Sequence, residues 1–196
     1  MGAEKALLPL GERPLIAHVV DRLRPQVDAL IINANGDPAR FDGFDCAIVP
    51  ERQEPGVGGP LVGVAAGLAY AASHGFARLA TAPCDAPFLP LDLVARLDAA
   101  MTRSGALAAL ALGERGLEPM FALWSVAAAR EIAAALARGE ASPRAVLAEL
   151  NAATAPFLAE NGEDPFANLN RREDLAAAHA RLTRARLPRA IRDDRA

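Results

Sequence analysis

Asp85 has the sequence context of a metal ligand. It follows the apolar segment 79–82 and lies between Pro83 and Pro87, which restrain the backbone on both sides. Proteins commonly hold Mg²⁺ with one or two carboxylates together with oxygens of substrate phosphates. Aspartate also forms ordinary turns, and that is the alternative. We interpret Asp85 as a candidate Mg²⁺ ligand.

Lys5 is the only lysine among 21 lysine and arginine residues. A lysine ammonium is a compact point charge and an arginine guanidinium is a planar fork. The two are interchangeable on a solvated surface but not in a phosphate cradle. Lys5 precedes the apolar run 6–10 at the start of the chain. Chance and a phosphate-binding role are both open on this feature alone.

Four of the six asparagines form two Asn-x-Asn pairs, Asn33 with Asn35 and Asn168 with Asn170. Each pair follows a predicted strand, and open α/β sheets bind ligands beyond the carboxyl ends of their strands. Amides can hold a base, a ribose or a phosphate without adding charge. For Asn35 and Asn170, taken singly, we favour local roles, a turn before glycine and a helix cap. Asn33 stands at the end of an isoleucine-rich predicted strand, where a helix-capping role explains its presence less well.

The glycine-rich segment 58–63 precedes and opens a predicted helix. Glycine permits close approach of the backbone to a ligand, and a helix N-terminus favours anions or polar groups. Gly59 and Gly63 are therefore candidate ligand contacts. The alternative is that Gly-Pro before a helix only marks where the helix begins.

Strand and helix signals alternate along the chain, which predicts βαβ units. We expect an α/β fold with a mostly parallel central sheet and helices on both faces. The predicted helices are 14–24, 61–74, 91–102, 126–138, 143–150 and 172–182, and the predicted strands are 29–32, 46–49, 79–82, 107–112, 120–124 and 166–169. We expect one domain over residues 1–182 and a solvated, partly disordered basic tail over 183–196.

Composition excludes several classes of protein. The net charge of −3 gives no general attraction to nucleic acid or to a membrane surface, and the apolar stretches are too short for a membrane span. Cys46 and Cys84 form no CxxC motif, so two buried, reduced thiols in a cytoplasmic protein are expected. The three histidines show no metal-ligand spacing.

Several motifs together carry a resemblance to a known family. The segment EKALLPL at 4–10, followed by PLI at 14–16, resembles the G-x-x-K-x-L-L-x-x-x-G-x-P-L stretch of nucleotidyltransferases. INAN at 32–35, GPLVG at 59–63, PCDAP at 83–87 and NLN at 168–170 follow in order. Over residues 1–180 the set resembles the molybdenum cofactor guanylyltransferase family, whose members join GMP from GTP to molybdopterin.

The resemblance implies a Rossmann-like, three-layer nucleotidyltransferase fold and assigns nucleotide-binding residues. Lys5 would contact the GTP phosphates and act in catalysis. Asn33 would bind the guanine nucleotide together with Glu51, the acidic residue after the next strand. Gly59 and Gly63 would belong to the same nucleotide-binding set.

The resemblance also implies the metal and the second substrate. Asp85 would bind Mg²⁺, and Asn168 and Asn170 would line the site near the metal and the pterin. A phosphate oxygen of molybdopterin would attack the α-phosphorus of GTP in line and release pyrophosphate. Such a reaction needs positioning and charge neutralisation more than covalent help. A molybdoenzyme or a cofactor-handling protein would be a further partner.

The chain departs from the family pattern at three places. The family begins with a strand and a loop of the form L-A-G-G-x-S-x-R-M-G, of which only Met1 and Gly2 are present, so we expect an N-terminally truncated domain. Glu51 stands where the family has aspartate. Glu118 precedes Pro119 where the family has histidine or glutamine.

Three alternative functions stay open. Two are enzymes, namely a cytidylyltransferase acting on the same cofactor and a sugar-phosphate nucleotidyltransferase. The third is a non-catalytic protein that binds molybdopterin or a partner enzyme.

Overall fold

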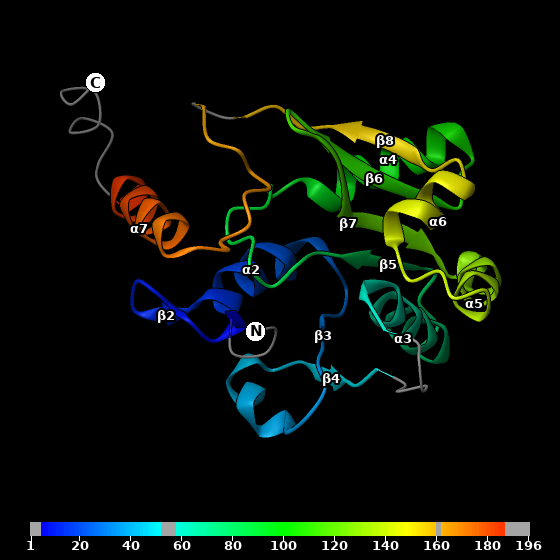
Figure 1. The fold of residues 1–196 in the computed structure, drawn as a ribbon, viewed down its shortest axis with the longest axis horizontal. Coiled ribbons are helices and arrows are strands. Elements are labelled where there is room, and N and C mark those ends of the chain that lie inside the picture. The colour runs from blue at the N-terminus through cyan, green and yellow to red at the C-terminus, as the bar shows by residue number, and fades with distance from the viewer. Residues whose placement is uncertain (1–4, 52–57, 160–161, 187–196) are drawn as a thin grey trace.

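A four-stranded sheet forms the centre of the computed structural model, which describes residues 5–51, 58–159 and 162–186 (Figure 1). The strand order is β5-β7-β6-β8. The strands are β5 (Arg78–Thr81), β6 (Ala108–Gly113), β7 (Gly116–Ser125) and β8 (Ala153–Pro156). Successive side chains of a strand point to opposite faces, so the sheet contributes to two hydrophobic clusters.

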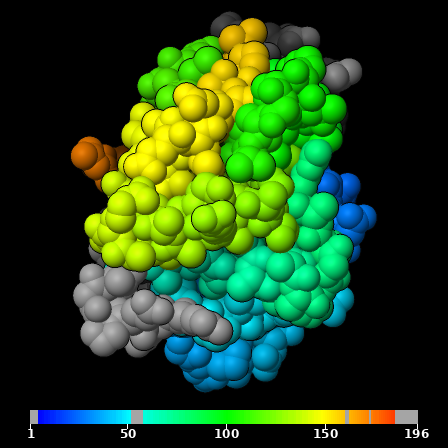
Figure 2. Space-filling model, turned by 90° about the vertical axis from the view of Figure 1, so that its right-hand side faces the viewer, coloured from blue at the N-terminus to red at the C-terminus, as the bar shows by residue number. Residues whose placement is uncertain are grey.

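Helices cover both faces of this sheet, as predicted. On one face α4 (Leu93–Ser104) packs against Phe121 and Leu123 of β7. The opposite face, around Trp124, is covered by α3 (Pro60–Ser73), α5 (Ala129–Ala137) and α6 (Pro143–Glu149). Figure 2 shows α5 and α6 together with α3 on one side of the molecule. The three-layer α/β architecture is thus confirmed.

The predicted mostly parallel sheet is wrong, because the sheet is mixed. β7 runs antiparallel to both β5 and β6, and only β8 pairs with β6 in a parallel manner. The turn at 114–115 explains the direction of β7, since so short a connection can join only antiparallel strands.

The strand predicted at 166–169 is also wrong. That segment is irregular in the structure, although Phe166 and Leu169 are buried as the apolar pattern required. The edge of the sheet beside β6 is occupied instead by β8, which the sequence analysis missed.

A smaller layer precedes the main sheet. It contains a short hairpin, the helix α2, two 3₁₀ turns and a separate pair of parallel strands. The bounds are β1 (Pro9–Leu10), β2 (Arg13–Pro14), α2 (Leu15–Leu23), η1 (Arg24–Gln26), β3 (Ile31–Asn33), η2 (Pro38–Phe44) and β4 (Ala47–Val49). The predicted helix at 126–138 divides into η3 (Val126–Ala128) and α5.

The last helix, α7 (Arg172–Arg186), returns to the hairpin near the start of the chain. The ring nitrogen Nε2 of His179 accepts a 2.9 Å hydrogen bond from the N–H of Gly11, and Ala178 joins a cluster with Leu10 and Leu15. This docking brings the preceding segment 168–170 next to the carboxyl end of β5. The helix extends four residues beyond its predicted end at 182, and the rest of the expected tail, 187–196, lies outside the described residues.

Within the part of the chain that the structure describes, no helix has both the length and the apolar character needed to cross a lipid bilayer.

Candidate active site

Lys5, Asp85 and Asn170 meet at the carboxyl end of β5. The Lys5 ammonium donates hydrogen bonds to Oδ2 of Asp85 and to Oδ1 of Asn170. The Lys5 and Asp85 side chains are only 13% and 15% exposed. Their ion pair is therefore shielded from water, where loss of one partner is costly. Three segments far apart in the sequence build this cluster.

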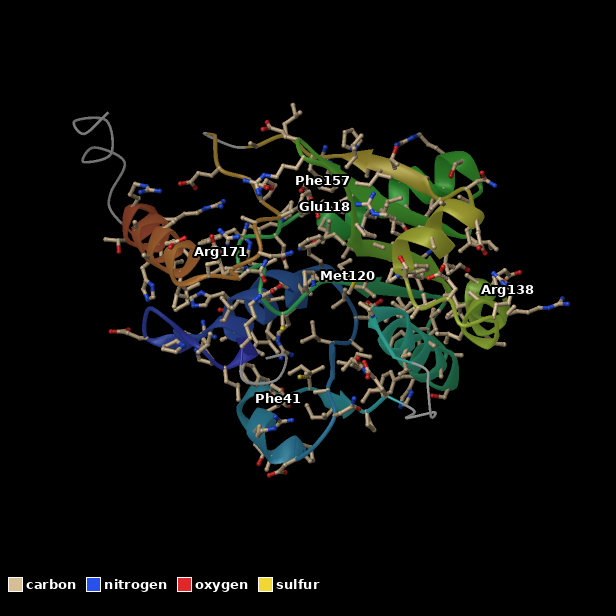
Figure 3. The ribbon with its side chains drawn as sticks, viewed as in Figure 1. Phe41, Glu118, Met120, Arg138, Phe157 and Arg171 are labelled. Atoms are coloured by element: carbon tan, nitrogen blue, oxygen red, sulfur yellow. The ribbon has the colours of Figure 1, made fainter. Side chains whose placement is uncertain are left out.

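Hydrogen bonds of the backbone hold the two loops of the cluster together. The N–H of Leu169 donates to the carbonyl of Asp85 at 2.9 Å, and Leu169 itself is buried. The Asp174 carboxylate accepts hydrogen bonds from the N–H groups of Arg171 and Asn170, both at 2.8 Å. These two bonds lower the pKa of Asp174. Figure 3 shows Arg171 at the start of α7.

The favoured capping role for the Asn170 side chain is therefore wrong. Its amide oxygen points to Lys5, and it is Asp174 that satisfies the free N–H groups before the helix. The sequence analysis did not single out Asp174. Its position four residues after Asn170 was the available signal.

A second cluster joins Asn33, Asn35 and Glu51 at the carboxyl ends of β3 and β4. The Asn35 side chain donates to Oε2 of Glu51 and accepts from the N–H of Glu51, both at 2.9 Å. Asn33 donates to the carbonyl of Val49 at 2.9 Å. Asn35, expected to serve a turn, thus fixes the carboxylate of Glu51.

Gly63 allows α3 to approach this second cluster. A Cβ atom at Gly63 would lie 2.5 Å from Oδ1 of Asn33 and 3.2 Å from Oε1 of Glu51. The first distance is shorter than any ordinary contact, so only glycine fits without displacing Asn33. Gly59 lies elsewhere: its φ is +107°, and its neighbour would be Ala141, 3.0 Å from an added Cβ. The structure brings Gly63 to the cluster and places Gly59 against the segment before α6.

A cavity of about 490 Å³ lies beside the second cluster. Asn33, Glu51 and Gly63 line it, and so does Cys84, the neighbour of Asp85, whereas Lys5, Asp85 and Asn170 are not among its lining residues. Burial raises the pKa of the Cys84 thiol, and the negative charge of Asp85 raises it further. The thiol is thus kept protonated, which argues against a nucleophilic role. Both cysteines are free and half-buried.

The residues around Asp85 fit a divalent cation that is shared with a substrate. Oxygens of Asp85 and Asn170 converge on the Lys5 ammonium, so they already surround a positive charge. Among the described residues, no group of three or more His, Cys, Asp or Glu side chains could hold a metal alone. The single carboxylate therefore suits Mg²⁺ with substrate oxygens completing its shell. The exposed Asn168 lies two residues before Asn170.

Glu118 lies in β7, opposite Ala111 of β6. Burial raises the pKa of its carboxyl group, and the negative charge of Asp164 raises it further. The raised pKa reflects the half-buried position of Glu118 in the sheet. Among the described residues, Glu118 forms no hydrogen bond or ion pair with either cluster.

Comparison with known proteins places these clusters in a family. Residues 1–154 match the MobA-like NTP transferase domain. A molybdenum cofactor guanylyltransferase of Cereibacter sphaeroides is 46% identical over 181 residues, which cover 92% of this chain and 89% of that protein. One from Bradyrhizobium sp. (strain ORS 278) is 40% identical, covering 90% of this chain and 84% of its own length.

Solved structures share the fold. The crystal structure of molybdopterin-guanine dinucleotide biosynthesis protein A from Archaeoglobus fulgidus has a TM-score of 0.70 at 19% identity, covering 92% of this chain and 91% of its own. A Mycobacterium tuberculosis protein in complex with manganese has a TM-score of 0.63 at 16% identity, covering 91% and 93%. Taken with the sequence relatives, these matches show that the chain belongs to the MobA-like NTP transferase family and, within it, to the molybdenum cofactor guanylyltransferases.

Proposed function

We propose that this chain transfers GMP from GTP to molybdopterin, which yields the guanine dinucleotide form of the cofactor and pyrophosphate. The observation that carries the proposal is the pair of polar clusters, Lys5–Asp85–Asn170 at the carboxyl end of β5 and Asn33–Glu51–Gly63 at the carboxyl ends of β3 and β4. The first suits phosphates and a cation, and the second suits a nucleoside. The high identity to guanylyltransferases over most of the chain supports the same reaction.

The second cluster is the proposed nucleoside-binding side. Asn35 occupies Oε2 of Glu51, while Oε1 faces Gly63. A carboxylate is an acceptor of hydrogen bonds, and guanine presents adjacent N–H donors at N1 and N2, whereas cytosine presents one amino group beside two acceptors. The fixed Glu51 carboxylate therefore favours GTP over CTP.

The first cluster is the proposed phosphate-binding side. Asp85, with the amide oxygen of Asn170, would hold Mg²⁺, which supplies positive charge for the phosphates when bound. Lys5 adds a second positive charge at the same point. Asn168, exposed on the same loop, is proposed to face the pterin substrate. The attacking molybdopterin oxygen forms a bond to the α-phosphorus as the bond to pyrophosphate breaks, and held geometry is what accelerates such a step.

The proposed function includes a cytoplasmic location. The free, half-buried thiols of Cys46 and Cys84 fit the expected cytoplasmic location, where thiols stay reduced.

The test is a transfer assay with purified protein, Mo-molybdopterin, MgCl₂ and either GTP or CTP. We expect a guanine dinucleotide product, with GTP preferred over CTP. Asp85→Asn should lower the rate by about 100-fold or more, because the charge for the cation and Lys5 is lost. The matched control is Asp92→Asn, an exposed aspartate before α4, which should keep wild-type activity. Equal use of CTP, or an active Asp85→Asn variant, would contradict the proposal.

A further inference from the structure

Two histidines from different helices hold the two ends of one peptide group. The peptide joins Leu10 to Gly11 at the turn between β1 and β2. Nε2 of His18 in α2 lies 2.8 Å from the Leu10 carbonyl oxygen. The Gly11 N–H donates to Nε2 of His179 in α7 at 2.9 Å. In Figure 1 the hairpin lies beside α7. This single peptide therefore ties α2, the hairpin and α7 together.

The bonding partners fix which ring nitrogen carries the hydrogen. A carbonyl oxygen can only accept, so Nε2 of His18 carries the hydrogen that Leu10 receives. Nδ1 of His179 likewise donates to the carbonyl of Leu175 at 2.8 Å, which leaves Nε2 as the acceptor for Gly11. His179 can therefore make both of its bonds only as the neutral ring, whereas His18 keeps its bond to Leu10 in either charge state.

The hairpin is connected to Lys5 through the backbone. The N–H of Leu8 donates to the Lys5 carbonyl at 3.2 Å, and the Leu8 carbonyl accepts from the N–H of Leu15 at 2.8 Å, where α2 begins. Leu10 is fully buried and packs in one cluster with Leu15. The position of the hairpin thus sets where the backbone of Lys5 lies.

The helix α7 is connected to Asn170 in the same way. Asp174 in the first turn of the helix accepts from the N–H of Asn170 at 2.8 Å. Leu169 packs with Ala178 of α7 in the cluster that contains Leu10. The Asn170 side chain in turn accepts from the Lys5 ammonium. A shift of α7 along the hairpin would therefore move Asn170 relative to Lys5.

We propose that His179 is a positioning residue for the transfer reaction, a role that rests on the proposed function: it holds α7 to the hairpin, and so Asn170 to Lys5, only while its ring is neutral. Protonation of Nε2 would set a second N–H against the N–H of Gly11 and remove the acceptor. Histidine gains its proton between about pH 8 and pH 5. The bond is therefore complete at the upper end of this range and is lost as the pH falls through it.

The other charged groups of these elements have partners of their own or are exposed. Arg13 of the hairpin pairs with Asp21 of α2, and Asp174 accepts from backbone N–H groups. The side chains of Arg181 and Arg184 both pair with Glu163, and those of Glu12 and Glu173 are exposed. Of the titratable groups named here, His18 alone shares the pH range of His179, and its bond survives protonation.

The first experiment measures GMP transfer at pH 8 and at about pH 5.5. In His179→Gln the amide oxygen can accept from Gly11 but cannot titrate. The ratio of the rate at pH 8 to that at pH 5.5 should be at least about threefold larger in wild type than in this variant, because one hydrogen bond is lost in acid. Protonation of the substrates affects both proteins equally and leaves the comparison unchanged. Equal ratios would overturn the proposal.

Three further variants sharpen this comparison. His179→Leu removes the acceptor at every pH and should be at least about threefold slower than His179→Gln at pH 8. His18→Gln keeps a donor for Leu10 and should show the wild-type pH ratio. The matched control is His74→Gln, at an exposed histidine that ends α3, which should also show that ratio. Loss of the pH ratio in either of these last two variants would contradict a role specific to His179.

The second experiment follows the wild-type chain by nuclear magnetic resonance without GTP or molybdopterin. Between pH 8 and about pH 5.5 the amide resonance of Gly11 and the side-chain amide of Asn170 should shift together with the ring of His179. Neither should shift in this way in His179→Gln. A shift of Gly11 without one of Asn170 would overturn the coupling to the site. If these shifts occur but wild type transfers no GMP at pH 8, the proposed function fails while the coupling of His179 to Asn170 stands.

Discussion

Gly63 offers the sharpest test of the nucleoside-binding cluster. In Gly63→Ala the new Cβ atom would lie 2.5 Å from Oδ1 of Asn33, about 0.9 Å inside the 3.4 Å of an ordinary contact. The Asn33 side chain must move by about that much, and its 2.9 Å hydrogen bond to Val49 must weaken. Misplacement of a binding group by about 1 Å can cost about 100-fold. We expect kcat/KM for GTP to fall by about that factor, mainly through KM.

Stability should change little in the same variant, because two effects oppose each other. Replacing glycine by alanine inside a helix stabilises it by about 0.5–1 kcal/mol. A weakened hydrogen bond of Asn33 costs about 0.5–1.5 kcal/mol. The free energy of unfolding should therefore stay within about 1 kcal/mol of wild type. A large loss of GTP use in a protein of normal stability distinguishes a binding defect from misfolding.

The measurements are GTP-dependent transfer kinetics and urea unfolding of the same samples. The matched control is Ala69→Gly, at an exposed position of the same helix. It should lose about 1 kcal/mol of stability while KM for GTP is unchanged. A wild-type KM in Gly63→Ala would refute the placement of Asn33 and Glu51 at the nucleoside.

Three further predictions concern other described residues. Lys5→Arg should lower transfer about 100-fold although the charge is kept, because a planar guanidinium cannot replace the ammonium between two oxygens; full activity would show that charge alone suffices. Asp174 has a pKa lowered below its ordinary 3.8, so its contribution to stability is complete above that value and is lost as the pH falls through the lowered pKa. Unfolding measured across this acid range should show the loss in wild type and not in Asp174→Asn, and identical acid sensitivity would argue against it. In the Cys46→Ser variant, the remaining Cys84 thiol should react with iodoacetamide far more slowly at pH 8 than it does in urea, since burial raises its pKa; equal rates would contradict a shielded thiol.

Local signals in the sequence were sufficient for most helices and for the candidate site motifs. Leu15, Val19 and Leu23 repeat at helical spacing, and α2 forms over Leu15–Leu23. Asp85 was singled out because prolines flank it, and the structure places it beside Lys5. Such features depend on neighbouring residues, which is why a sequence can show them without knowledge of the fold.

The direction of β7 and the existence of β8 depended on pairing between strands. β8 is the short segment Ala-Thr-Ala-Pro, with little strand character of its own. It is a strand because β6 supplies a hydrogen-bonding edge. Phe166 and Leu169 show the reverse case, since their apolar side chains are buried by packing in an irregular segment.

The roles of individual polar side chains were decided by contacts between distant parts of the chain. The sequence by itself determined that Asn35 and Asn170 follow apolar segments, and local rules assigned them to a turn and a cap. Only the tertiary structure brought Asn35 to Glu51, and Asn170 to Lys5, which is 165 positions away along the chain. A short polar side chain can satisfy its hydrogen bonds locally or across the fold, and the outcome depends on which groups the packed helices and strands place within reach.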